Sequence, residues 1–403
     1  MECRNCKGSL ESVLDLGELY PSNFVETTEG EKIGLELTFC TECGLVQLND
    51  TAELDSMYRQ YWYKSGLNPT MVKALQNIVD GVKELGYTEG NILDIGANDG
   101  TLLKLFGDGY FKVGIDPALN LAEEASKHCN FINDYFPSED LPDTKYDVIT
   151  SIAMFYDLPD PNAFVEAINK YLKDDGVWIV QFTDLVSMFK LNAFDNICHE
   201  HLEYYSLTFL YEFLNKHNLS IFNVEYNQVN GGSIRLYVDK HSRPVHFSVN
   251  YCLYNEYLYM TSFANPFEAF KERVLKAKAS LKTFLYNKAK LNFDKVYVLG
   301  ASTKGNVLLQ YYGLDTQYLK KALEVNKDKF GLKTVGSNIP IVAEERGMFD
   351  NPEFLLILPW GFTNFFVKKF DKYIRDGGQL IVPLPVPMVA YLGKYGTIVW
   401  EKI

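Results

Sequence analysis

The sequence has no apolar run that approaches the length of a membrane span, and basic residues are scarce in it. It contains 39 Lys or Arg against 52 Asp or Glu, which gives a net charge of −13 over 403 residues. Binding to nucleic acid requires clustered positive charge, so this balance argues against a nucleic-acid partner. The first residues, Met1 to Arg4, do not read as a signal peptide, and we expect a cytoplasmic protein without membrane contact.

Cysteine is also scarce, because seven residues at uneven spacing are too few for a disulfide scaffold. Four of the seven form two Cys-x-x-Cys pairs, Cys3 with Cys6 and Cys40 with Cys43. Two such pairs, separated by a stretch that alternates as strands do, are the ligand set of a tetrahedral zinc site. We expect this Zn²⁺ to be structural, because four thiolates leave no open position for a substrate. Two unrelated pairs of buried thiols are the alternative.

Low-complexity segments and internal repeats are absent as well, and 47% of the residues are hydrophobic, as in a well-packed globular protein. A chain of this length is too long for one ordinary core, so two or three domains are expected. We expect helices at residues 51–90, 207–218 and 250–290. The first range holds a dense aromatic group that predicts a core or interface stripe, from which one tyrosine can present its hydroxyl to a ligand. This group consists of Tyr58, Tyr61, Trp62 and Tyr63.

An apolar strand, a glycine-bearing turn and an amphipathic helix follow one another over residues 91–103. The next strand ends in Asp116, where an acid can accept both hydroxyls of a ribose. The turn lacks the dinucleotide spacing GxGxxG, and its Asp94 and Asp99 would repel a pyrophosphate. It therefore suits a nucleoside with a cationic centre and no phosphate, which describes S-adenosylmethionine (SAM). The cofactor residues expected on these strand ends are Asp94, Gly96, Ala97, Asn98, Gly100, Asp116, Asp134 and Ser151.

A second unit of strand, glycine turn and helix begins at residues 295–306. Its turn carries Ser302, Thr303 and Lys304 and no acid, which suits a phosphate, although the spacing is not that of a Walker motif. Arg235, on an earlier strand, can pair with a phosphate as well, and a surface salt bridge is its common alternative. Taken alone, the second unit is also compatible with a degenerate Rossmann domain that binds nothing.

Two of the six histidines lie together around a carboxylate in the run Cys198-His199-Glu200-His201. The run follows the buried strand 176–182, and open α/β sheets place their ligands just beyond such strand ends. A histidine there can titrate near neutrality and move protons. A second metal site that includes Cys198 and a structural hydrogen-bond network are the two alternatives.

The order of these features resembles the three-domain nucleotide-sugar C-methyltransferases, which act in the biosynthesis of branched deoxysugars. The matching pieces are the two Cys-x-x-Cys pairs, 94–100, 198–201, 231–235 and 300–306, and together they span nearly the whole chain. The resemblance implies an α/β protein with a zinc-binding module at residues 1–66. A class I, Rossmann-like SAM methyltransferase domain would follow at 67–240. A second Rossmann-like domain at 241–403 would assist nucleotide-sugar binding.

The resemblance also implies methyl transfer from SAM to carbon 3 of a 4-keto-deoxysugar linked to a nucleoside diphosphate, by a protein that we expect to be a monomer. His201 would be the base, and Glu200 would orient or tune its imidazole. Tyr63 or His199 would stabilise the oxygen of the resulting enolate. The substrate would further meet Ser22, Asn23, Phe24, Tyr61, Tyr156, Cys198, Arg235, Ser302, Thr303 and Lys304.

Two positions depart from the family pattern. Cys198 stands where well-known members carry Tyr, and Tyr156 stands where many carry His, so the sugar contacts differ. An O- or N-methyltransferase on a similar sugar is the nearest alternative, since it would need no base able to make an enolate. A non-catalytic zinc-containing binding protein is an alternative of another class. A nicotinamide oxidoreductase using the turn within residues 295–306 is a third, and the missing GxGxxG argues against it.

Overall fold

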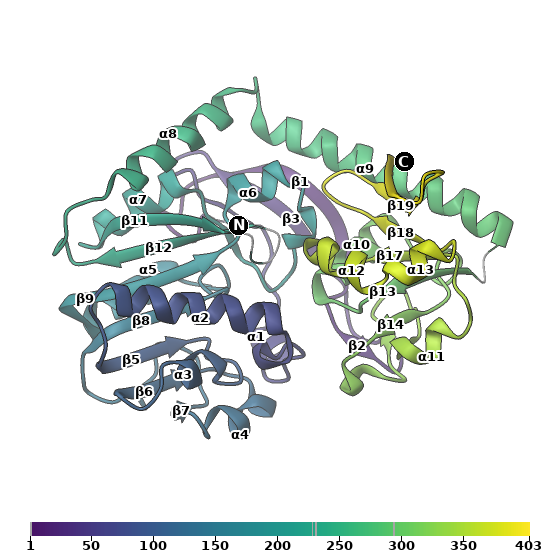
Figure 1. Ribbon diagram of the computed structural model, residues 1–403. Coiled ribbons are helices and arrows are strands. Elements are labelled where there is room, and N and C mark those ends of the chain that lie inside the picture. Colours follow the sequence, from purple (N-terminus) through teal and green to yellow (C-terminus); the bar gives the residue numbers. More distant parts are fainter. Residues whose placement is uncertain (1, 228, 230–231, 293–294) are drawn as a thin grey trace.

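The computed structural model describes residues 2–227, 229, 232–292 and 295–403, which form three sheets of four, seven and seven strands and one two-stranded ribbon (Figure 1). The α/β fold expected from the sequence is confirmed. Of the matching piece 231–235, Gly231 lies outside the described residues. Among the residues described, no helix is both long enough and apolar enough to span a bilayer.

The four-stranded sheet has the order β1-β3-β4-β10, and all its pairs are antiparallel. Its first three strands are β1 (Leu10–Leu19), β3 (Ile33–Cys40) and β4 (Val46–Leu48). Its last strand, β10 (Glu203–Tyr204), comes from a distant part of the chain and pairs with Gln47 and Val46. The chain that directly follows the histidine run is therefore part of the zinc module's sheet.

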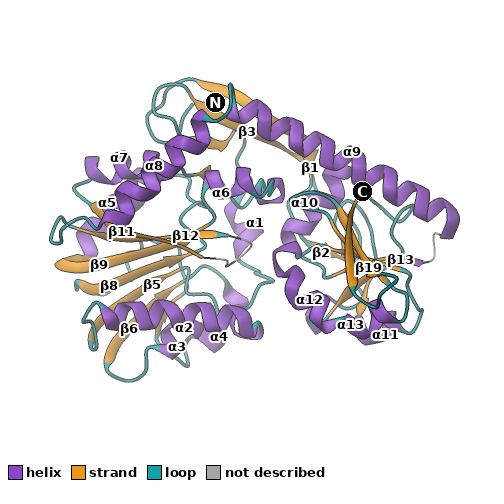
Figure 2. Cartoon of the chain, turned by 45° about the horizontal axis from the view of Figure 1, so that its top comes forward, coloured by secondary structure: helices purple, strands orange, loops and turns teal. Residues whose placement is uncertain are grey.

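The central seven-stranded sheet has the order β11-β12-β9-β8-β5-β6-β7. Strands β5 to β9 run parallel, and β12 is antiparallel to both of its neighbours. Their side chains alternate between two cores: Ile92 and Val148 pack with α2 and α3, while Leu93 and Ile149 pack with α5 and α7. Helices therefore cover both faces, as Figure 2 shows. The strands are β5 (Gly90–Ile95), β6 (Tyr110–Ile115), β7 (Asn130–Ile132), β8 (Tyr146–Ile152), β9 (Leu172–Phe182), β11 (Ser220–Asn227) and β12 (Ser233–Asp239).

The C-terminal sheet has the order β16-β14-β13-β17-β18-β19-β20, with a parallel part that ends at β18 and an antiparallel hairpin beyond it. Its strands are β13 (Val296–Leu299), β14 (Ala322–Glu324), β16 (Ile341–Ala343), β17 (Phe354–Ile357), β18 (Gln379–Val382), β19 (Met388–Leu392) and β20 (Ile398–Lys402). A two-stranded ribbon joins β2 (Phe24–Val25) to β15 (Lys333–Thr334). It ties the zinc module to the C-terminal unit.

The helices connect and cover these sheets. They are α1 (Leu54–Tyr58), α2 (Pro69–Glu84), α3 (Thr101–Leu105), α4 (Ala122–Ala125), α5 (Pro161–Tyr171), α6 (Leu185–Lys190), α7 (Leu207–Lys216), α8 (Phe247–Thr261), α9 (Pro266–Asn292), α10 (Thr303–Tyr312), α11 (Glu344–Met348), α12 (Thr363–Lys369) and α13 (Asp371–Arg375). Helices α8 and α9 run along one side of the molecule and link the central unit to the C-terminal one (Figure 1).

Two of the expected helices are each broken in two. The range 51–90 holds α1 and α2, because Asn68 caps α2 by accepting a hydrogen bond from the Thr70 amide and Pro69 starts the helix. The range 250–290 is divided in the same way, by an Asn265 cap and Pro266 at the start of α9. The expected helix 207–218 is confirmed as α7. The domain boundaries near residues 66 and 240 stay a prediction.

Candidate active site

The four cysteines of the two Cys-x-x-Cys pairs converge in the structure. Their sulfur atoms all lie within 4.8 Å of one another, with Cys3 and Cys43 at 3.5 Å and Cys6 and Cys40 at 3.5 Å. Each pair sits in a turn that ends in the left-handed conformation, at Lys7 after the first pair and at Gly44 after the second. Zn–S bonds of about 2.3 Å in a tetrahedron require sulfur atoms at about this separation. The donor set therefore fits a closed, structural Zn²⁺ site.

The glycine turn after β5 forms one end of a large cavity. Gly96 (φ +74°) and Asn98 (φ +53°) both adopt left-handed backbone conformations there. Asp116, at the end of β6, accepts hydrogen bonds from the amides of Asn98 at 2.8 Å and Ala118 at 2.9 Å. Burial raises the pKa of Asp94 to about 7, while a hydrogen bond from Thr150 at 2.6 Å opposes the shift. A buried carboxyl of this kind suits a cationic ligand, because the ligand's charge restores the ionised form.

The aromatic segment between α1 and α2 lies over this turn instead of continuing a helix. The side chain of Asn98 accepts a hydrogen bond from the Ser65 amide and donates one to the Tyr63 carbonyl. The side chain of Asn120 accepts a bond from the Tyr61 amide and donates one to the Tyr61 carbonyl. These bonds hold the backbone of residues 61–65 against the loops that follow β5 and β6, so the segment forms a wall of the cavity.

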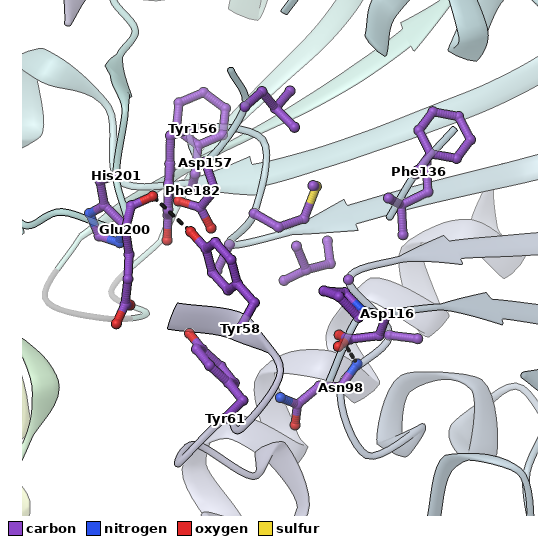
Figure 3. A pocket seen from close by; sticks show the side chains of 18 of the residues that line it. Tyr58, Tyr61, Asn98, Asp116, Phe136, Tyr156, Asp157, Phe182, Glu200 and His201 are labelled. Carbon is purple, nitrogen blue, oxygen red and sulfur yellow. Dashed lines mark hydrogen bonds between the residues drawn. The ribbon is translucent and has the colours of Figure 1, made fainter. Parts of the chain in front are cut away.

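The cavity has a volume of about 510 Å³ and extends from the glycine turn to the histidine run. Figure 3 shows Asn98 and Asp116 on one side, Glu200 and His201 on the other, and Tyr58 and Tyr61 between them. Lys304, from the first turn of α10, also lines the cavity. Residues of the segment between α1 and α2, of the unit built on the central sheet and of the C-terminal unit thus enclose a single space, large enough for two small molecules side by side.

His201 is held in one tautomer. Its Nδ1 lies 2.8 Å from the backbone carbonyl oxygen of Asn196, which can only accept, so Nδ1 carries the proton. Nε2 is then left with a free lone pair, which a proton-abstracting group requires. Tyr156 packs against the imidazole with ring centroids 4.2 Å apart. Burial, assisted by the Lys304 ammonium, lowers the pKa of His201 to about 3, so the ring is neutral at physiological pH.

Carboxyl groups with raised pKa values surround this imidazole. Burial raises the pKa of Glu200 to about 7, and the Lys304 ammonium opposes the shift. Burial and the neighbouring Glu200 raise the pKa of Asp157 well above its usual range, and its Oδ1 is buried without a hydrogen-bond partner. The ligand atoms of Cys198, Glu200 and His201 lie within 4.8 Å of one another, so the metal-binding alternative has three suitable donors there.

The C-terminal unit reaches the histidine run through the short helix of residues 194–196. Phe194 stacks on Tyr312, with ring centroids 5.2 Å apart, and Trp360 donates a hydrogen bond of 2.8 Å to Asp195. The Lys304 ammonium donates a short hydrogen bond to the side-chain oxygen of Asn196. Every residue of this helix therefore contacts the C-terminal unit, and the last one also positions His201.

The expected site residues divide into those that line the cavity and those that do not. Lining residues are Asp94, Gly96, Ala97, Asn98, Asp116, Tyr61, Tyr63, Tyr156, Glu200, His201, Thr303 and Lys304. Gly100, Asp134, Ser151, His199, Cys198, Arg235, Ser302 and Ser22 to Phe24 are not among the described lining residues. Their roles stay predictions.

Several of the expected site residues that do not line the cavity form hydrogen bonds with other protein groups. Ser22 donates to the Thr303 carbonyl at 2.8 Å, and Asn23 accepts from Trp62 Nε1 at 2.8 Å. Arg235 is buried behind Gln181, to which it donates at 2.9 Å. His199 Nε2 lies 3.1 Å from the Ile33 carbonyl. Together these contacts hold the walls of the cavity.

Some lining residues were not expected from the sequence. Tyr58 donates a hydrogen bond of 2.9 Å to the Glu200 carbonyl, and Asp157 and Gln181 also face the space. The aromatic spacing around Tyr58 carried a signal, because one tyrosine was expected to reach a ligand. Asn196, which is not among the described lining residues, carried no such signal, since it holds His201 through its backbone carbonyl.

Comparisons with known proteins match the chain in three consecutive parts. Family models match for a zinc-binding domain at residues 3–58, a methyltransferase domain at 72–224 and a C-methyltransferase C-terminal domain at 228–385. These matches, with the converging cysteines, confirm the predicted zinc-binding module and the predicted SAM methyltransferase unit.

The chain is also similar to individual proteins. Over 369 residues the chain is 28% identical to C-methyltransferase NovU of Streptomyces niveus, which covers 88% of this chain and 87% of that protein. A ubiquinone biosynthesis O-methyltransferase of Histophilus somni is 26% identical over 145 residues, covering 31% of this chain and 59% of that protein. A solved SAM-dependent methyltransferase of Clostridium acetobutylicum aligns with a TM-score of 0.36 and 13% identity, over 42% of this chain and 91% of that one.

Proposed function

We propose that this chain, a SAM-dependent methyltransferase similar to the three-domain nucleotide-sugar C-methyltransferases, methylates carbon 3 of a nucleoside-diphosphate 4-keto-deoxysugar. The observation that carries the proposal is the placement of His201. His201 lines the same cavity as the glycine turn of the methyltransferase unit, and the hydrogen bond of its Nδ1 leaves a free lone pair on Nε2. Transfer to oxygen or nitrogen needs no base able to form an enolate, whereas transfer to carbon does.

The residues at the glycine turn fit the cofactor. Asp116 retains free lone pairs for ribose hydroxyls beside its two backbone hydrogen bonds, and Asp94 presents a carboxyl to a cationic group. Gly96 keeps the turn close to the cavity, because a Cβ there would lie 2.8 Å from Met154. When bound, SAM supplies a methyl group activated by a positively charged sulfur.

At the other end, the proposed reaction begins with proton transfer. His201 Nε2 removes the hydrogen from the carbon beside the ketone, and the electron pair of that bond moves toward the ketone oxygen. An ionised Glu200 stabilises the imidazolium that forms, because its carboxylate lies within 4.8 Å of the ring. General-base assistance of this kind is worth about 10²- to 10⁴-fold. The apolar and aromatic lining, including Tyr156, excludes water from the carbanion.

Deuterium exchange tests the proposal without requiring a full turnover. The protein is incubated in D₂O with S-adenosylhomocysteine and a panel of nucleoside-diphosphate 4-keto-deoxysugars, and the carbon-3 proton is followed by NMR against a protein-free control. Enzyme-dependent exchange is the expected result. The sugar that exchanges fastest identifies the substrate class.

One outcome would overturn the enolate mechanism. If SAM is turned over on one of these sugars while none of them exchanges, the acceptor atom is oxygen or nitrogen. Mass spectrometry of the product, followed by NMR of the new methyl group, then locates the acceptor.

A further inference from the structure

Lys304 reaches the histidine end of the cavity from another structural unit. It is the second residue of α10, in the C-terminal domain, and its ammonium donates a hydrogen bond to the side chain of Asn196. The backbone carbonyl of the same Asn196 holds Nδ1 of His201. One residue thus ties the ammonium group and the imidazole to the same end of the cavity.

The ammonium group has unused donors. It carries three N–H groups, and among the described residues Asn196 is its one hydrogen-bond partner. Lys304 is also the one Lys or Arg among the described lining residues. At least two donors are therefore available to an oxygen atom of a bound molecule.

The surroundings are wrong for a diphosphate. The Lys304 ammonium acts electrostatically on Asp157, Asp195 and Glu200, and it lowers the pKa of each against the larger effect of burial. A diphosphate brought to this point would have a single cation to pair with, and each of the three neighbouring carboxyl groups would repel it once ionised. One oxygen atom that gains charge only during the reaction is a better match for one ammonium group.

We propose that Lys304 is a catalytic residue that binds the ketone oxygen of the acceptor and stabilises its negative charge, and that it is not a diphosphate anchor. The proposal rests on the proposed function, because it requires an acceptor with a ketone beside the reacting carbon. Its basis is the shared attachment of Lys304 and His201 to Asn196, together with the free donors of Lys304.

The proton transfer balances with this assignment. His201 Nε2 gains the proton, the C–H electron pair becomes the second bond between the two carbons, and the carbonyl π pair moves to the oxygen. That oxygen bears the charge and accepts hydrogen bonds from the ammonium group, which keeps its own protons. The two groups act on opposite ends of one three-atom unit, so both are needed for the same step.

Contacts with the zinc module fix the position of Lys304. Ser22 donates a hydrogen bond to the carbonyl of Thr303, the residue before it, and Asn306 donates one of 2.9 Å to the Asn23 carbonyl. The amide of Gly305 is capped by the Ser302 hydroxyl at 3.0 Å. Residues 22–23, which do not line the cavity, thus position a residue that does.

The test compares Lys304→Met with the wild type in two assays. The first is the rate of carbon-3 deuterium exchange at saturating sugar with S-adenosylhomocysteine bound. The second is the affinity for free uridine and thymidine diphosphates by calorimetry. We expect the exchange rate to fall by about 10²- to 10³-fold, as for loss of one oxyanion donor, with nucleoside diphosphate affinities within about twofold. Lys304→Arg keeps a cation and should retain more of the rate than Lys304→Met.

Lys368→Met is the matched control, because Lys368 is an exposed lysine of the same domain and should change neither assay. Unaltered binding of S-adenosylhomocysteine verifies that the Lys304 variants are folded, and Lys304→Gln replaces the methionine variant if that one does not fold. If Lys304→Met exchanges at the wild-type rate while its affinity for nucleoside diphosphates falls tenfold or more, the Lys304 proposal is overturned and the proposed function is not. Absence of exchange in the wild type would overturn it together with the proposed function.

Discussion

The backbone carbonyl of Asn196 accepts a hydrogen bond of 2.8 Å from Nδ1 of His201, five residues further along the chain. Because a carbonyl cannot donate, this bond leaves the lone pair on Nε2. The same carbonyl also accepts a bond of 3.2 Å from the Tyr204 hydroxyl. The tautomer of the proposed base is therefore set by the backbone of the short helix that the C-terminal unit holds.

Replacing His201 with Asn should remove the base and leave the cofactor site intact. We expect carbon-3 exchange to fall by about 10²- to 10⁴-fold, since no other described group has a lone pair held in the same place. The affinity for S-adenosylhomocysteine should stay within about twofold, because the glycine turn lies at the far end of the cavity (Figure 3). NMR exchange and calorimetry measure the two quantities.

His241→Asn is the matched control for this variant. His241 is exposed and has φ +58°, a conformation that asparagine tolerates well, so the control should behave as the wild type. Exchange that survives in His201→Asn would show that another group removes the proton, and Glu200 would be the first to test.

SAM binding should depend on pH through Asp94. Burial raises its pKa to about 7, so the carboxyl is mostly neutral at pH 6 and mostly ionised at pH 8. A cationic ligand favours the ionised form, and its affinity therefore rises with pH and levels off above the pKa. We expect SAM to bind about tenfold more tightly at pH 8 than at pH 6, measured by calorimetry in matched buffers.

Asp94→Asn should bind SAM weakly and lose this pH dependence. Asp108→Asn, at an exposed position in the connection between α3 and β6, should keep both the affinity and its slope. A wild-type affinity that is constant from pH 6 to pH 8 would mean that Asp94 does not face the cationic part of the cofactor.

Local patterns carried the parts of the fold that the sequence could predict. The strand, turn and helix at 91–103 and the two Cys-x-x-Cys turns are each made within a few residues, so spacing alone identifies them. The start of α2 is also encoded locally, by Asn68 and Pro69. The sequence pattern nevertheless predicted one continuous helix over 51–90. The predicted cofactor residues Asp94, Gly96, Ala97 and Asn98, which line the cavity, lie on such a local element.

Long-range pairing accounts for what the sequence could not predict. Strand β10 has two residues and pairs with a strand more than 150 positions earlier, so it has no recognisable pattern of its own. The hydrogen bond from Ser22 to the Thr303 carbonyl and the one from Lys304 to Asn196 join separate units in the same way. The resemblance implied that Ser22 and Asn23 contact the substrate. In the structure Ser22 instead bonds to the Thr303 carbonyl and Asn23 to Trp62.

Removing Zn²⁺ should disturb the methyltransferase site as well as the zinc module. Strand β4 follows the second cysteine pair and pairs with β10, and β10 directly follows His201. Chelation with EDTA should lower the Tm by more than about 5 °C, because binding of a structural Zn²⁺ contributes directly to folding free energy. Carbon-3 exchange should fall as zinc is lost, when both are measured on the same samples by atomic absorption and NMR.

Cys43→Ser should reproduce the effect of chelation, since it removes one of the four ligands. Cys129→Ser is the control, because this thiol lies outside the cluster and donates to the Ala125 carbonyl. A zinc-free protein with wild-type exchange would show that the module's sheet does not depend on the metal.

The rate of carbon-3 exchange should itself rise with pH through Glu200. Burial raises the pKa of this carboxyl to about 7, and the ionised form makes His201 more basic by stabilising its imidazolium. The pKa of His201 is lowered to about 3, so that group contributes no inflection near neutrality. At saturating S-adenosylhomocysteine we expect exchange at pH 6 to be about tenfold slower than at pH 8.

Glu200→Gln separates this effect from every other titration in the protein. At pH 8 the variant should exchange more slowly than the wild type. The variant's own rate should be nearly the same at pH 6 as at pH 8. Glu212→Gln changes an exposed position on α7 in the same way and should keep the wild-type profile. If the inflection near pH 7 persists in Glu200→Gln, it belongs to another group, and Asp157, which lies beside Glu200, is the next carboxyl to replace.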